Sequence, residues 1–159
     1  MNRQTTGGLS LVLLRLSLGL AFLTTWLSNF QKGVFTNSGY VNTLRGYIEN
    51  AQHIDSPFDF LVRDVLIPNV EIFLLFQIMI ELIIWVSLVF GLFTRACSLL
   101  GAFLSFSLLF LALGIEWPWT YILMIAGFVV CAWTSAGRWY GVDFWLQKKL
   151  PGSLRKILI

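Results

Sequence analysis

Four long runs of apolar residues constrain the fold of this chain more than any other feature. They cover approximately residues 9–30, 67–92, 96–115 and 119–136, and a helix needs about 20 such residues to cross the hydrocarbon core of a membrane. Charged residues make up 12% of the chain, about half of their share in an average soluble domain. The pattern predicts an all-α fold, a four-helix transmembrane bundle, with the whole chain (1–159) forming a single membrane domain.

The connections between the runs differ in length. Short polar breaks, FTR and EWP, separate the second, third and fourth runs, which predicts antiparallel helical hairpins. The connection at residues 31–66 is long and carries helical patterns of its own. One has apolar residues at helical spacing around Tyr40, Leu44 and Tyr47, and another starts at Pro57. We therefore expect short amphipathic helices in this loop, lying on the membrane surface or covering the bundle.

Lysine and arginine residues in the short flanks predict the orientation in the membrane. With four spans, both termini and the loop between spans two and three share a side, which holds seven basic residues against three on the other side. We expect an integral protein of the cytoplasmic (inner) membrane with both termini cytoplasmic, an extracytoplasmic loop at 31–66 and a basic tail at 137–159. The basic residues flank apolar segments, so the net charge of +3 indicates contact with the lipid bilayer and not with nucleic acid.

Two charged residues stand inside the apolar runs. At 1.5 Å per residue, Arg15 lies about 9 Å and Glu81 about 15 Å from the cytoplasmic side, a difference that an arginine side chain can reach across. An unpaired charge at these depths costs several kcal/mol. The sequence therefore predicts that Arg15 and Glu81 form an ion pair in the bundle interior.

Helical spacing places further polar and aromatic residues beside these charges. Trp26 and Asn29 share a face with Arg15, and Gln77 and Trp85 share one with Glu81. An interior that is both polar and aromatic suits a planar ligand with a polar rim, such as a quinone head group. The residues equally allow an ion pair that only fixes helix register, with the tryptophans as ordinary core.

The sequence contains no motif for a cofactor other than a quinone. The sequence has no haem-attachment motif, clustered cysteine ligands, HExxH or GxGxxG, so no haem, metal or flavin site is evident. An electron carrier would have to be a quinone or belong to a partner subunit. Small residues line one face each of the third and fourth runs, which favours close helix packing within the chain or against another subunit. They are Ser98, Ala102 and Ser105, with Gly101 beside them, and Gly127, Cys131 and Ser135.

Three segments resemble the DoxX-like membrane protein family. LLRLSLGLAFLTTWLSNFQKG resembles its first span, and ELIIWVSLVFGLFTRACSLLGAFLS its second motif. The closing segment, EWPWTYILMIAGFVVCAWTSAGRWYGVDFWL, resembles the DoxD branch, the small membrane subunit of thiosulfate:quinone oxidoreductase. The resemblance implies a four-helix bundle that works with a second subunit in oxidising thiosulfate to tetrathionate while a quinone is reduced. The family's Arg and Glu fall on Arg15 and Glu81, and its Gly-x-Asp on Gly141 and Asp143.

Our first hypothesis is a membrane subunit of a quinone-linked oxidoreductase, for which the resemblance implies thiosulfate as the substrate. Arg15 and Glu81 would be catalytic, and Trp26, Gln77 and Trp85 would bind the quinone. The alternative is a non-catalytic accessory or anchoring subunit of a larger respiratory or redox complex in the membrane. Both hypotheses predict other protein subunits as partners. A small transporter is disfavoured, because the chain has neither an internal repeat nor a pair of broken helices.

Overall fold

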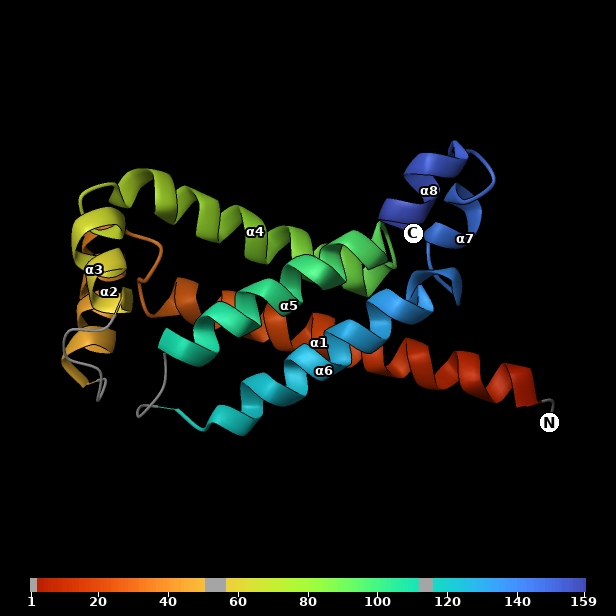
Figure 1. Ribbon diagram of the computed structural model, residues 1–159, viewed down its shortest axis with the longest axis horizontal. Coiled ribbons are helices and arrows are strands. Elements are labelled where there is room, and N and C mark those ends of the chain that lie inside the picture. The colour runs from red at the N-terminus through yellow and green to blue at the C-terminus, as the bar shows by residue number, and fades with distance from the viewer. Residues whose placement is uncertain (1–2, 51–56, 112–115) are drawn as a thin grey trace.

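The computed structural model describes residues 3–50, 57–111 and 116–159, and these residues fold entirely into helices and their connections (Figure 1). The long helices are α1 (Arg3–Gln31), α4 (Val70–Phe90), α5 (Thr94–Leu111) and α6 (Pro118–Thr134). The shorter elements are α2 (Asn37–Asn50), α3 (Pro57–Phe60), the π-helical turn η1 (Leu61–Leu66), the 3₁₀ turn η2 (Ala136–Arg138), α7 (Asp143–Leu146) and α8 (Gly152–Leu158).

Three of these helices are long and apolar enough to cross a membrane, in the segments Gly7–Gln31, Val70–Phe90 and Thr94–Leu111. They coincide with the first three predicted runs, although residues 112–115 of the third lie outside the described residues. Helix α6 is apolar but has 17 residues. Large apolar side chains such as Ile72, Phe103 and Leu123 are mostly exposed, as expected for helices that face lipid instead of water.

Local sequence signals explain where several helices begin and end. Pro57 starts α3 and Pro118 starts α6, at the position where a missing N–H costs nothing. Helix α4 ends at Gly91, which adopts the left-handed conformation (φ 69°) that glycine tolerates best. The tight turn that follows leads directly into α5, so that the second and third predicted runs form the expected hairpin.

Helices α1, α4, α5 and α6 pack lengthwise against one another, with α1 against α4 and α6, and α5 against α6 and α4. Their core includes Ile84, Leu88 and Phe128, which are completely buried. The small-residue faces lie in this core, where Gly101 leaves room for the Phe128 ring. Ser98, Ser105 and Cys131 are also buried, so these faces serve packing within the chain.

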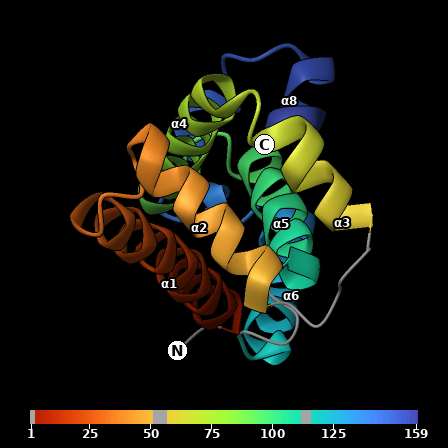
Figure 2. The ribbon, with the colours of Figure 1, turned by 90° about the vertical axis from the view of Figure 1, so that its left-hand side faces the viewer.

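The shorter helices close the two ends of the molecule (Figures 1 and 2). Helix α2 crosses one end and contacts α4, with Leu44 buried and Tyr40 and Tyr47 half-buried on its inner face. The helices predicted in the long loop are thus present, apart from residues 51–56, which lie outside the described residues. At the other end, the basic tail folds into η2, α7 and α8, and its last residue, Ile159, is completely buried.

The register of α1 against α4 differs from the predicted one. Gly19 faces Leu88 and Val89, and Asn29 is hydrogen-bonded to Glu81. Arg15 therefore lies beside the end of α4, and 14 residues of α1, about 21 Å at 1.5 Å per residue, separate it from the level of Glu81. The predicted Arg15–Glu81 ion pair is wrong.

The physical reason is that α1 extends further than its apolar run suggests. The depth estimate placed the start of that run level with the end of α4. In the structure α1 continues past α4, and Gly8 packs against the Trp139 ring at the far end of the molecule.

Candidate functional site

Glu81 is the buried carboxylate of α4, with 4% of its surface exposed. Gln77, one turn earlier on the same helix, donates a hydrogen bond from Nε2 to Oε1 at 2.5 Å. Asn29 of α1 donates from Nδ2 to both carboxylate oxygens, at 3.4 Å each. The structure therefore brings together two of the predicted site residues, Glu81 and Gln77, and adds Asn29, which the sequence placed on the same face of α1 as Trp26.

Among the residues that the structure describes, no basic side chain forms an ion pair with Glu81. Within the residues that the structure describes, the ion pair present joins Arg63 and Asp59 at the surface of α3 and η1. Burying a carboxylate inside a membrane helix is costly, and amide donors offset the cost only in part. A buried ionisable group held in this way is a strong candidate for a functional residue.

Two tryptophans extend this cluster along both helices. Trp26 lies one turn before Asn29 on α1, and Trp85 lies one turn after Glu81 on α4; both are half-buried. The Trp26 ring stacks on Phe30, with ring centroids 6.1 Å apart and planes 5° apart. Both indole nitrogens are buried and have no hydrogen-bond partner among the described residues, although a buried N–H normally has one.

Helix α2 covers this end of the long helices (Figure 2). Burial, followed by the negative charge of Glu81, raises the pKa of Tyr40 above its usual value. Burial and the carboxylates of Glu116 and Glu81 likewise raise the pKa of Tyr47. Both phenols thus lie within the electrostatic field of Glu81 and stay protonated. We call Trp26, Asn29, Gln77, Glu81 and Trp85 the Glu81 site.

Arg15 occupies a different place. It is 2% exposed, and its Nη1 donates to the backbone oxygens of Ala136 at 3.5 Å and Trp139 at 3.4 Å. The guanidinium also packs against Gly91 and Gly141, where a Cβ atom would overlap it. The buried charge is thus held by carbonyl oxygens of the segment that follows α6, a partner that the sequence analysis did not find.

Asp143 completes this second polar cluster. The carboxylate is fully buried and accepts hydrogen bonds from the backbone N–H groups of Phe93 (2.7 Å) and Thr94 (2.9 Å). It therefore caps the first turn of α5, where an anion also benefits from the helix dipole. The backbone N–H of Asp143 in turn donates to the Gly91 oxygen at 2.9 Å.

The glycines of the AGRWYGVD segment make these contacts possible. A Cβ atom at position 137 would overlap the side chains of Thr94 and Asp143, so only glycine fits there. Gly141 packs against Gly91. We call Arg15, Gly91, Gly137, Gly141 and Asp143 the Arg15–Asp143 junction. The resemblance marked Arg15, Gly141 and Asp143, but it did not predict that these residues meet.

Metal-ligand geometry is not seen in the part of the chain that the structure describes: no group of three His, Cys, Asp or Glu side chains could hold an ion. Cys97 and Cys131 are free and buried. The fold and the two polar clusters together define a small helical membrane protein. The buried carboxylate site lies on the side of α2, and the polar junction lies at the tail.

Comparison with known families places this class more narrowly. Residues 10–159 match the family model DoxD, described as the TQO small subunit, where TQO is thiosulfate:quinone oxidoreductase. The chain belongs to the DoxD family, and the resemblance stated from the sequence is confirmed. It is accordingly a small subunit of an oxidoreductase complex that uses a quinone. No match was found among the curated proteins or among the solved structures.

Proposed function

We propose that the Glu81 site holds the head group of a membrane quinone and that the Glu81 carboxyl exchanges protons there. The observation that carries this proposal is a carboxylate 4% exposed within a membrane helix, whose hydrogen bonds among the described residues come from amide side chains. Membrane helices tolerate such a group mainly where it serves a ligand or a proton path.

The residues of the site fit this ligand. A quinone head group is a flat ring with a carbonyl oxygen at either end, and the unpartnered indole N–H groups of Trp26 and Trp85 are donors for such oxygens. The indole rings also offer flat apolar surfaces. When bound, a quinone accepts two electrons, which the family's reaction takes from oxidising two thiosulfate ions to tetrathionate, and two protons.

The chain's own side chains would position the quinone and protonate it. Gln77 and Asn29 fix the carboxyl of Glu81 from two helices, so its oxygens face a constant direction. Glu81 would release a proton from a carboxyl oxygen and regain it afterwards, and Tyr40 and Tyr47 of α2 provide further hydroxyl groups near it. Arg15, in contrast, would act by holding the tail in place, because it lies at the other end of α1.

We further propose that α6 is a fourth span and that both termini are cytoplasmic. Seventeen helical residues cover about 26 Å, and exposed tryptophans, Trp117 and Trp133, stand at its two ends as in an interfacial belt. The seven basic residues at the end with the tail support the orientation. Glu81, near the middle of α4, would then lie close to the middle of the membrane. A partner subunit would bind thiosulfate.

The test compares Glu81→Gln with Glu71→Gln, the same substitution at an exposed position of the same helix. Membranes containing the assembled complex should lose quinone reduction about 10²-fold with Glu81→Gln, the usual size of a general acid–base contribution. Glu71→Gln should keep it. Co-purification of the partner subunit shows whether the variant assembles.

Unchanged turnover of the assembled Glu81→Gln complex would remove Glu81 from the mechanism and favour an accessory subunit. A second readout does not need turnover: quinone titrated into the purified protein should quench tryptophan fluorescence. Replacing Trp26 and Trp85 together by phenylalanine should remove the saturable part of that quenching.

A further inference from the structure

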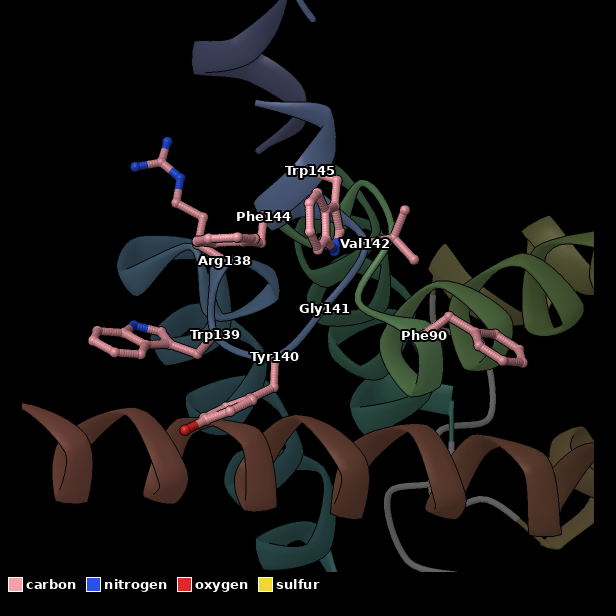
Figure 3. A pocket seen from close by; sticks show the side chains of 8 residues that line it. All are labelled: Phe90, Arg138, Trp139, Tyr140, Gly141, Val142, Phe144 and Trp145. Atoms are coloured by element: carbon pink, nitrogen blue, oxygen red, sulfur yellow. The ribbon is translucent and has the colours of Figure 1, made fainter. Parts of the chain in front are cut away.

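A hollow lies in the segment that follows α6, at the opposite end of the molecule from helix α2. It has a volume of about 560 Å³, within the usual range of ligand pockets. The segment after α6 forms most of its wall, and Phe90 at the end of α4 completes it (Figure 3). We call it the tail pocket; its lining residues are Phe90, Arg138, Trp139, Tyr140, Gly141, Val142, Phe144 and Trp145.

The walls of the tail pocket are aromatic and unusually exposed. Tyr140 is 79%, Trp145 69% and Phe90 58% exposed. Figure 3 shows the Tyr140 and Trp145 side chains on opposite sides of Gly141. Tyr140 has a backbone φ of 52°, a conformation that is costly for a bulky residue. The Tyr140 ring is therefore held in an exposed position in spite of an unfavourable backbone conformation.

The charge around the tail pocket is positive. Five basic residues and one acidic residue, Asp143, follow Glu116 in the sequence, and Asp143 is fully buried in hydrogen bonds to backbone N–H groups. The Arg138 guanidinium extends away from Gly141 (Figure 3) and, within the described residues, has no ion pair. The Lys148 ammonium lies 5.6 Å from the centre of the Phe144 ring.

The position of the pocket also matters. The segment after α6 is hydrogen-bonded to the end of α4 at Phe90 and Gly91. The pocket therefore lies at the end of a helix that is long and apolar enough to cross a membrane, where such a helix reaches the lipid–water interface. Aromatic rings and arginine or lysine side chains are the groups that proteins place against lipid headgroups.

We propose that the tail pocket binds one anionic phospholipid, with its phosphate at Arg138 and its apolar part against Trp145, Tyr140 and Phe90. The aromatic walls favour a lipid over a small hydrated anion, because an anion such as phosphate or thiosulfate gains nothing from apolar surface. The positive charge at the rim favours an anionic over a zwitterionic headgroup. This site is separate from the Glu81 site and does not depend on its assignment.

The experiment is native mass spectrometry of the purified full chain in mild detergent. It is titrated with dioleoyl-phosphatidylglycerol and, separately, with dioleoyl-phosphatidylcholine, which has the same acyl chains. The wild type should retain one phosphatidylglycerol about tenfold more tightly than phosphatidylcholine. Arg138→Gln should weaken the binding of phosphatidylglycerol about fivefold, which is the effect of one basic residue near an anionic lipid. Arg45→Gln, which removes an exposed charge from α2 at the other end, should change it less than about twofold.

A variant of the walls separates the pocket from general charge attraction. Trp145→Ala, at an exposed position, should weaken the binding of both lipids. If charge attraction alone held the lipids, this substitution would leave their binding unchanged. Equal retention of the two lipids, or an Arg138→Gln variant that binds like Arg45→Gln, would overturn the proposal. So would displacement of phosphatidylglycerol by thiosulfate or phosphate at low millimolar concentration, because the pocket would then be a site for a free anion.

Discussion

Asp143 should contribute more to the stability of this protein than any exposed carboxylate of the chain. It is completely buried and accepts two backbone hydrogen bonds, of 2.7 and 2.9 Å, at the start of α5. A hydrogen bond to a charged group contributes about 1.5–3 kcal/mol. Asp143→Ala removes both and leaves the N–H groups of Phe93 and Thr94 without an acceptor, so we expect a loss of about 3–5 kcal/mol.

The Asn variant refines this expectation. Asp143→Asn keeps the shape of the side chain and one acceptor oxygen but loses the charge and the second acceptor. It should cost about half as much as Asp143→Ala. Since total stabilities are about 5–15 kcal/mol, the Ala variant should still fold at low temperature but unfold much earlier.

Unfolding in mixed micelles with increasing denaturing detergent, followed by tryptophan fluorescence, measures both variants. Trp139 and Trp145 flank Asp143 in the sequence and report on the segment directly. Asp64→Ala, at an exposed position of η1, is the control and should leave the midpoint unchanged. If Asp143→Ala unfolds within about 0.5 kcal/mol of the wild type, the carboxylate does not hold the tail to the α4–α5 turn, and the reasoning is wrong.

Three further outcomes follow from the structure. Gly91→Ala should cost about 1–3 kcal/mol of unfolding free energy, because its left-handed φ of 69° and the adjacent guanidinium both oppose a side chain, whereas Gly152→Ala, in open space, should be neutral. Gly101→Val should lower the unfolding temperature, since even a Cβ atom would lie 2.6 Å from the fully buried Phe128 ring; a melting temperature equal to that of the wild type would contradict this packing. Because burial and neighbouring carboxylates raise the pKa of Tyr47 above 10.0, its contribution to stability is complete below pH 10 and is lost as the pH rises further. Tyr47→Phe should therefore make the decline in stability above about pH 10 less steep than in the wild type.

The candidate site could be predicted in part. Gln77, Glu81 and Trp85 follow one another at intervals of four residues on one helix. A carboxylate within an apolar run also has to point into the bundle. Their proximity needed only helical periodicity. That Asn29 reaches Glu81 could be suspected from its place on the Trp26 face, but the contact depends on the register of two helices, which periodicity does not determine.

The partner of Arg15 was beyond the reach of the sequence for a different reason. Its hydrogen bonds end on the backbone oxygens of Ala136 and Trp139, and every residue has such an oxygen. A search for a charged partner therefore selects Glu81, the nearest acidic residue by estimated depth. The glycines at 137 and 141 and the aspartate at 143 were the available signals, since tight packing needs glycine and a buried cap needs an acceptor.

The sequence by itself determined the class of the protein: apolar runs of membrane-spanning length, glycine and proline at the helix ends, and two charges that had to be buried. These are local properties, governed by hydrophobicity and backbone sterics. The tertiary structure alone decided which groups meet. Helix α1 continues past the end of α4, and this offset moves Arg15 to the tail and leaves Glu81 with amides. The length of an apolar run records the thickness of the membrane and not the position of one helix along another.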